Sequence, residues 1–525
     1  MANSGLWRTK SIEQSIADTD EPRSRLRRDL GAWDLIVFGV AVCVGAGIFT
    51  LAASTAGDIA GPAVSLSFVF AAIACALAAL CYTEFASTVP VAGSAYTYSY
   101  ATFGELIAWI IGWDLVLEFS LAAAVVAKSW STYLAEVIGL TGLGISTTFG
   151  LGPLTADWGA AALVAALTVL LVLGTKLSSR VSQVITAIKV AVVLLVIVVG
   201  FGYVNAENYT PFIPPAAEGS EAAGGLDQSL LSLLLGGETS TYGVFGLFAG
   251  ASIVFFAFIG FDIIATTAEE TRNPQRDMPR GIFGALAIVT VLYVAVALVL
   301  TGMQPFTELA TTEAGESTLA TAFAANGVDW AAGVISVGAL AGLTTVVMVL
   351  LLGQTRVLHA MSRDNLIPRG LSATGSHGTP VRITVGVGVV VAVLAALVDF
   401  GTLAELVNVG TLFAFVLVSI GIIVLRRTRP DLPRGFRVPF VPWVPIAAVL
   451  ACLWLMLSLT AFTWVRFGIW LAIGLVVYFL YGARHSRGLL RSASASTSRV
   501  PSSRRTTGTE SCRGDSPRRG PTGLA

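Results

Sequence analysis

Long apolar segments separated by short polar ones run through most of the chain. Each apolar segment holds about 20 residues or more, which at roughly 1.5 Å per helical residue crosses a hydrocarbon core about 30 Å thick. Uninterrupted apolar runs favour helices over the alternating pattern of a membrane barrel. The pattern therefore predicts an all-α integral membrane protein. Its twelve predicted spans cover residues 32–56, 62–88, 104–136, 158–178, 183–204, 243–268, 280–302, 330–358, 380–399, 404–426, 441–463 and 466–483.

The charges between these spans alternate from one side to the other. Arginine or lysine follows spans four, six, eight and ten, whereas the segments 140–157, 205–242 and 303–329 contain neither residue. Basic loops stay on the cytoplasmic side of a membrane. We therefore expect both termini to be cytoplasmic in a multi-pass protein of the plasma membrane. The first 30 residues are polar and lack a short apolar stretch with a cleavage site, so we expect no cleaved signal peptide.

Composition changes this picture little. The chain has 525 residues, 55% of them hydrophobic and 12% charged, with a formal net charge of zero. No soluble domain and no nucleic-acid-binding patch is expected from such a chain. Four of the five cysteines lie inside apolar runs without metal-binding spacing, so we expect neither a metal nor a cofactor. The Ser-, Arg- and Gly-rich residues 486–525 predict a disordered cytoplasmic tail.

Glycines interrupt two of the predicted helices. The first span contains "VGAGIF", with Gly45 and Gly47 near its middle, and the sixth contains "FFAFIGFDII", in which Asp262 follows Gly260. Each glycine costs a helix about 1 kcal/mol relative to alanine. Close helix packing explains one such motif. A pair in corresponding spans of two five-helix repeats points instead to broken helices around a transport site.

Broken helices suit a zwitterion. The exposed N–H groups at the start of a half-helix attract a carboxylate, and freed carbonyl groups attract an ammonium group. An amino acid carries both groups on one carbon. The backbone of two broken helices is therefore able to hold the part that all amino acids share, which leaves side chains to select among them.

Four long motifs carry a resemblance to a known family. They read "GAGIFTLAASTAGDIAGPAVSLSF", "ALCYTEFASTVPVAGSAYTYSYATFGELIAWIIGWDLVLEF", "FFAFIGFDIIATTAEETRNPQRDMPRGI" and "LLLGQTRVLHAMSRDNLIP". Over residues 25–485 the chain resembles the cationic amino acid transporter family of the amino acid-polyamine-organocation superfamily. The resemblance implies a leucine-transporter-like fold with two inverted five-helix repeats, helices 1 and 6 broken, and two C-terminal helices. The predicted parts are 1–30, a cytoplasmic segment; 31–204, the first repeat; 205–242, an extracellular loop; 243–426, the second repeat; 427–485, helices 11 and 12; and 486–525, the tail.

The same resemblance places the substrate on the two breaks. It implies that the carboxylate meets the backbone of Val44, Gly45, Ala46, Gly47 and Ile48, and that the ammonium group meets carbonyls of Phe256, Ala257, Phe258 and Ile259. Phe258 stands where many relatives carry tyrosine, so it lacks that hydroxyl group and is expected at most to form an aromatic lid.

Two charged residues inside the spans are candidates for substrate binding and coupling. Lys189 lies in span five, where the family places a lysine beside the first broken helix. A desolvated ammonium group releases its proton more readily than one in water, so we expect Lys189 to couple transport to protons. Glu118 in span three matches a family glutamate near the binding region and is expected to attract the substrate ammonium group. The alternative for Lys189 is that its ammonium group reaches the membrane–water interface. The alternative for Glu118 is a structural hydrogen bond or ion pair.

Five residues are weaker candidates, for a gate. Glu84, Glu270 and Arg363 lie at the cytoplasmic ends of the spans, and Phe258 and Asp262 lie inside span six. Asp262 has a structural alternative as the anchor of the second half of span six. The others have the alternative of ordinary solvated loop charges, because surface ion pairs contribute little.

The sequence as a whole predicts a secondary active transporter that imports amino acids by alternating access, coupled to protons. Motifs of ATP-driven pumps, zinc hydrolases and nucleophile elbows do not occur in it, so we expect no enzyme. An amino acid/amine exchanger, a polyamine carrier, a channel and an amino acid sensor remain alternatives. We see no extra carboxylate in span six ahead of Asp262, which favours neutral amino acids over arginine and lysine.

Overall fold

The computed structural model describes most of the chain. The described residues are 29–88, 94–142, 145–151, 154–174, 179–216, 225–236, 241–311, 317–371 and 379–486. The predictions for residues 1–28 and for the tail after residue 486 lie outside them.

Helices make up nearly all of the described chain, with one short β-hairpin. The longer helices are α2 (Ala32–Cys43), α4 (Val64–Thr88), α6 (Glu105–Leu140), α7 (Trp158–Val172), α8 (Ser179–Phe201), α10 (Gly243–Val254), α12 (Pro274–Met303), α14 (Asp329–Arg363), α15 (Val381–Leu397), α16 (Phe400–Thr428), α17 (Trp443–Leu457) and α18 (Ala461–Val477). The shorter ones are α3 (Ala52–Thr55), α5 (Ser94–Thr102), α9 (Leu230–Leu235), α11 (Phe261–Thr266) and α13 (Leu319–Ala325). The hairpin joins β1 (Thr148–Leu151) to β2 (Leu154–Asp157), with Thr148 opposite Asp157.

The predicted all-α membrane class is confirmed. Eight helical stretches of the described residues are long and apolar enough to cross a membrane, and four shorter apolar helices accompany them. A membrane-spanning helix satisfies its own backbone hydrogen bonds, which is why long apolar runs fold this way. The division into twelve spans and two inverted repeats stays a prediction.

Side chains fix where several helices begin. The carboxylate of Asp157 accepts the N–H of Ala160 at the start of α7, and Asp399 accepts the N–H of Thr402 at the start of α16. Thr460 does the same for α18. Each contact satisfies one of the N–H groups that lack an acceptor within the helix. The polar residues between the apolar runs thus set the helix boundaries.

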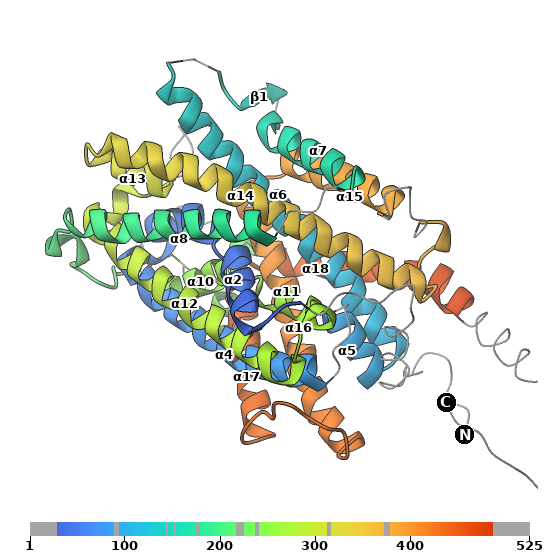
Figure 1. Ribbon diagram of the computed structural model, residues 1–525. Coiled ribbons are helices and arrows are strands. Elements are labelled where there is room, and N and C mark those ends of the chain that lie inside the picture. Colours follow the sequence, from blue (N-terminus) through green and yellow to red (C-terminus); the bar gives the residue numbers. More distant parts are fainter. Residues whose placement is uncertain are drawn as a thin grey trace, which may run out of the picture.

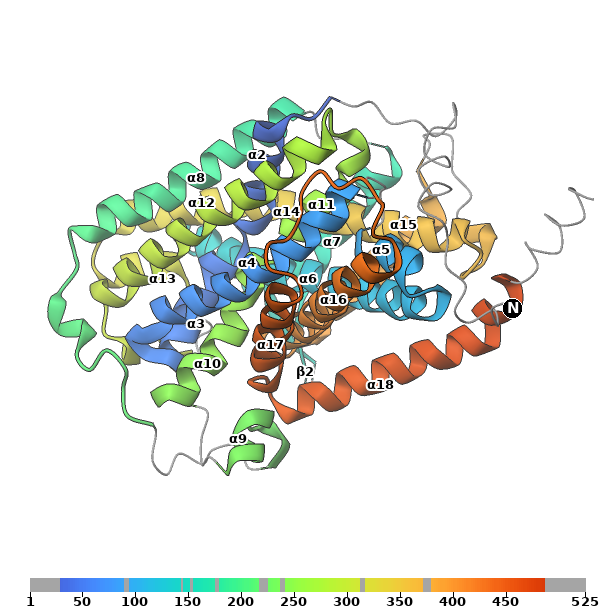
Figure 2. The same ribbon diagram turned by 90° about the horizontal axis from the view of Figure 1, so that it is seen from below.

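Helix α6 lies at the centre of the bundle. Its most apolar stretch is 83% buried inside the protein, whereas that of the segment containing α18 is 22% buried. Helix α14 packs along α6, and α12 packs against α2 and α4. Figure 1 shows these helices crossing around α2 and α11, and Figure 2 shows α18 along the outer edge. The faces of α6 therefore meet other helices, and much of α18 faces outward.

Candidate functional site

The first broken helix leaves α-geometry where the glycines predicted. Helix α2 ends at Cys43, and Val44 is extended, with φ −70° and ψ 90°. The chain resumes as a wide π-helical turn over Gly47–Leu51 and continues through α3. The predicted carboxylate seat at Val44–Ile48 thus coincides with an interrupted backbone. The helix that starts there has N–H groups without acceptors inside the helix.

The second broken helix has its own interruption. After α10 the chain forms a 3-10 turn over Phe255–Phe258, and Ile259 is then extended with ψ 129°. Gly260 has φ +129°, a conformation that side-chain-bearing residues rarely adopt. The Asp262 carboxylate accepts the N–H of Gly260 at 3.1 Å. Asp262 thus anchors the start of α11, which agrees with its structural alternative.

The two interruptions touch one another. A Cβ atom added to Gly47 would lie 2.3 Å from the Cα atom of Ala257. One added to Gly260 would lie 2.7 Å from a methyl group of Val42. Each break therefore contributes a glycine that lets the backbone of the other approach closely.

Two residues from other helices satisfy the carbonyl groups that the first break releases. In a continuous helix the carbonyls of Ala41 and Cys43 would accept N–H groups four residues later. Instead, the Lys189 ammonium group donates to the Ala41 carbonyl at 2.7 Å, and the Tyr293 hydroxyl donates to the Cys43 carbonyl at 2.6 Å. Tyr293 also lies 2.9 Å from the Ala257 carbonyl. Lys189 is fully buried, and its bond to the Ala41 carbonyl puts its ammonium group at the break.

A cavity lies between the two breaks and two further helices. Helix α6 contributes Ala122 and Val126, and α14 contributes Val346 and Leu350. The full lining is Val42, Cys43, Gly45, Ala46, Gly47, Ala122, Val126, Phe256, Ile259, Val346 and Leu350. Each of these residues is glycine, cysteine or apolar. The cavity thus joins interrupted backbone to apolar side chains. Its volume is about 20 Å³, which is room for about one water molecule, so binding a larger molecule requires the surrounding helices to move apart.

Other predicted site residues lie outside this lining. Phe258 is fully buried, and its ring packs against Phe68 and Tyr293 at centroid distances of 6.3 and 5.3 Å. The aromatic ring at the cavity is that of Phe256. Glu118 is buried in α6 one turn from Ala122 and interacts with Thr411.

Comparison with known proteins identifies the family. The model of the amino acid permease family matches residues 30–482. The chain belongs to the amino acid permease family. It is 45% identical to the branched-chain amino acid permease BcaP of Bacillus subtilis, over 92% of this chain and 98% of that one. It is 43% identical to the methylthioribose transporter of the same organism, over 92% and 99% of the two chains. The vacuolar cationic amino acid transporter 4 of Arabidopsis thaliana is 30% identical over 92% and 96%.

Membership makes this permease a multi-pass membrane transporter rather than an enzyme.

Sequence reasoning missed several residues of its site. Tyr293 was the single tyrosine of the apolar span 280–302, a signal that was available. Val126, Val346 and Leu350 gave none, because every face of a long apolar run has the same composition.

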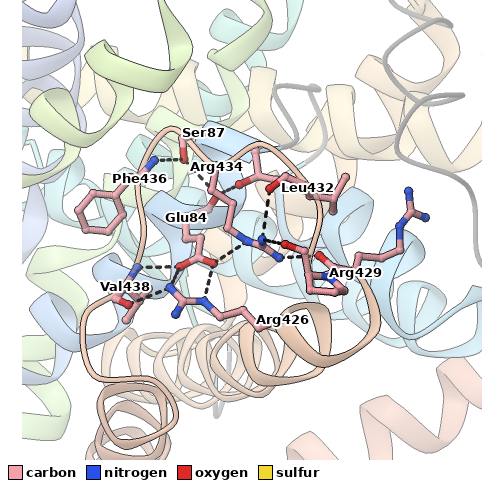
Figure 3. Close-up of polar contacts among 10 residues, drawn as sticks. Glu84, Ser87, Arg426, Arg429, Leu432, Arg434, Phe436 and Val438 are labelled. Atoms are coloured by element: carbon pink, nitrogen blue, oxygen red, sulfur yellow. Dashed lines mark hydrogen bonds and ion pairs between the residues drawn. The ribbon is translucent and has the colours of Figure 1, made fainter.

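Glu84 and Glu270, two charged residues of the predicted gate, pair with different arginines in the permease. Figure 3 shows Glu84, fully buried at the end of α4, receiving the guanidinium group of Arg426 through two nitrogen atoms at 3.0 and 2.6 Å. Arg434 approaches the same carboxylate at 3.2 Å, and the Val438 N–H donates to it at 2.7 Å. Glu270 instead lies 3.6 Å from Arg356. Glu84 thus holds the segment that follows α16 against helix α4.

We expect Glu84→Ala to destabilise the permease by about 3 kcal/mol, because it leaves the buried Arg434 and the partly buried Arg426 without their carboxylate. Thermal unfolding of the purified protein in detergent measures the effect. Glu270→Ala is the matched control and should cost less than about 1 kcal/mol, since its pair is solvated. Equal melting of the two variants would contradict this account of Glu84.

We expect Tyr293→Phe to lower the free energy of unfolding by about 1–3 kcal/mol, because the single hydroxyl proton serves the buried Cys43 carbonyl, with the Ala257 carbonyl also within reach. The ring contacts with Phe258 and Phe68 remain in this variant, so the loss reports the hydroxyl group. Tyr209→Phe is the control, since that hydroxyl donates to a single carbonyl, Leu298, at an exposed position. Thermal unfolding of both variants measures the difference. A melting temperature of Tyr293→Phe equal to that of wild type would refute the role of the hydroxyl group at the break.

Proposed function

We propose that this permease imports neutral aliphatic amino acids across the plasma membrane by alternating access. The observation that carries the proposal is the cavity, which joins two interrupted backbones to an apolar wall. The substrate carboxylate would meet the N–H groups at Gly45–Gly47, and its ammonium group the carbonyls of the Phe256–Ile259 segment. Carbonyl oxygens have two lone pairs, so those already accepting one donor can accept another.

The wall selects the side chain in this proposal. Val126, Val346 and Leu350 offer apolar contact to a branched aliphatic group, and burial contributes about 0.8 kcal/mol per CH₂. A guanidinium or ammonium group would need a carboxylate there, and burying it unpaired is costly. Glu118 is outside the lining. The similarity to a branched-chain amino acid permease supports the same choice.

Coupling to protons belongs to the same proposal. Lys189 holds the end of the first half-helix through the Ala41 carbonyl. A change in its charge would therefore act directly on the break that binds the substrate carboxylate. We place both termini in the cytoplasm and arrange the first ten spans as two inverted five-helix repeats, with helices 11 and 12 following them.

Uptake into proteoliposomes tests the proposal. Purified protein is given labelled leucine with an inward proton gradient, and unlabelled valine, isoleucine, arginine, lysine, putrescine and methylthioribose compete in separate assays. We expect leucine accumulation, with competition by valine and isoleucine and little by the cations. Preference for arginine, for putrescine or for methylthioribose would overturn the proposed substrate class.

A further inference from the structure

Asp114 is a buried carboxyl group that the site described above does not use. It lies in α6 about two and a half turns after the helix begins, and its side chain is fully buried. Across the described part of the chain, neither of its carboxyl oxygens has a hydrogen-bond partner. A carboxylate anion without donors is costly away from water. A carboxylate left at this position after the site closes to water would therefore readily take up a proton from a neighbouring acid.

The neighbouring helix leaves room for this carboxyl group. A Cβ atom at Gly410 of α16 would lie 2.8 Å from Oδ1 of Asp114. A larger residue at position 410 would press on the acid. The contact between α6 and α16 is thus shaped around a polar group that nothing in the described structure satisfies.

Asp114 shares a face of α6 with the cavity. Asp114, Glu118, Ala122 and Val126 follow one another at intervals of four residues, which places them along one side of a helix. Ala122 and Val126 line the cavity. The face therefore leads from the cavity through Glu118 to Asp114, in the direction of the predicted cytoplasmic end. Successive Cβ atoms on it are about 5–6 Å apart.

The charged groups around this row are few. Glu118 interacts electrostatically with Asp114 on its own helix and with Asp262 of α11. Helix α16 faces the row with Gly410 and Thr411, both uncharged.

Helix α14 adds no counter-charge to the row among the described residues. The side-chain nitrogen of its Gln354 donates to the Ser120 hydroxyl group. It also donates to the Val116 carbonyl at 3.3 Å. Arg356 of the same helix is directed to Glu270. Among the described residues of α14 and α16, no cation contacts the carboxyl groups of the row, an arrangement suited to carrying protons.

We propose that Asp114 is the inner proton acceptor of the permease, which takes the coupled proton from Glu118 and releases it to the cytoplasm. The proposal rests on the proton coupling proposed above. In the step itself an O–H bond breaks at the Glu118 carboxyl group and an O–H bond forms at a previously deprotonated Asp114. No electrons are gained or lost overall. Asp114 then gives the proton to water when the predicted cytoplasmic end opens.

The test compares wild type with Asp114→Asn in proteoliposomes. A gradient of one pH unit is worth about 1.4 kcal/mol, which supports roughly tenfold leucine accumulation with one proton per substrate. We expect wild type to approach that ratio and Asp114→Asn to lose it. Leucine counterflow without a gradient should keep its half-saturation concentration in the variant, and its rate should lose its dependence on internal pH.

The outcomes separate the two proposals. If wild type itself fails to accumulate leucine under the gradient, the coupling is wrong and the role of Asp114 falls with it. If wild type and Asp114→Asn accumulate leucine equally, only the role of Asp114 is overturned. Asp114→Leu serves as a second variant, since it removes an unpaired polar group and should fold with undiminished thermal stability while showing the same loss.

Glu105→Gln is the matched control. Glu105 is also buried in α6, but its carboxylate accepts hydroxyl groups of Tyr478 at 3.0 Å and Ser486 at 2.7 Å. It lies roughly two and a half turns from Asp114, on the opposite side of the helix. We expect its variant to accumulate leucine like wild type. An equal loss in Glu105→Gln and Asp114→Asn would show a general effect on α6 and would overturn the proposal.

Discussion

Replacing Gly47 with alanine is expected to abolish transport. The new methyl group would lie 2.3 Å from the Cα and Cβ atoms of Ala257, a distance at which the two broken helices must move apart. Ala257 presents backbone there, so no flexible side chain can give way. Overpacking of this kind costs about 1–3 kcal/mol, and it would separate the proposed seats of the substrate carboxylate and ammonium group. Initial uptake rates of labelled leucine in proteoliposomes measure the loss.

Gly39→Val and Gly45→Ala separate packing from binding. A Cβ atom added to Gly39 would lie 2.5 Å from Ile264 and 2.6 Å from Ala285, so the valine variant should lower thermal stability by distorting helix packing. A Cβ atom on Gly45 has its closest neighbour, Val346, at 3.5 Å and projects at the cavity. Gly45→Ala should therefore fold like wild type and raise the half-saturation concentration for leucine. Full transport by Gly47→Ala would contradict the close contact of the two breaks.

Replacing Lys189 with methionine is expected to uncouple transport from the proton gradient. Methionine preserves much of the apolar stem, which packs 2.9 Å from the position of a Cβ atom on Gly342, but it has no ammonium group for the Ala41 carbonyl. One pH unit supports roughly tenfold leucine accumulation in the coupled protein. In Lys189→Met the inside and outside concentrations of leucine should become equal. Lys189→Ala should show the same loss with lower stability, because it also leaves a cavity.

Lys128→Met is the matched control for this experiment. Lys128 is a half-buried lysine of α6 that interacts electrostatically with Asp157. Its variant should keep proton-driven accumulation of leucine. Stimulation of wild type by sodium alone, or normal proton-driven accumulation by Lys189→Met, would refute the role of Lys189.

The sequence predicted the features that depend on local backbone. Apolar runs forecast the helices, and the pair of motifs with Gly45, Gly47 and Gly260 forecast the interruptions. Glycine alone only weakens a helix, since Gly342 and Gly353 lie in the unbroken α14.

The position of Lys189 beside the first break came from the family resemblance. Its partner, the Ala41 carbonyl, follows from the break itself, which deprives that carbonyl of its helical donor.

Contacts between distant segments were not predictable in this way. Glu84 meets Arg426 from a helix 342 residues away, and the intervening apolar runs do not specify which loop folds over α4. Tyr293 reaches carbonyls 250 and 36 residues earlier in the chain. Which valines face the cavity also depends on how the helices rotate against one another. These features required the three-dimensional packing.

A structure of the permease with bound leucine tests the central claim most directly. The account predicts the leucine carboxylate at the N–H groups of Gly45–Gly47 and its ammonium group at the Phe256–Ile259 carbonyls. The isobutyl group should lie among Val126, Val346 and Leu350. Leucine bound with its carboxylate directed to the apolar wall, or bound outside the space between the two breaks, would contradict the account.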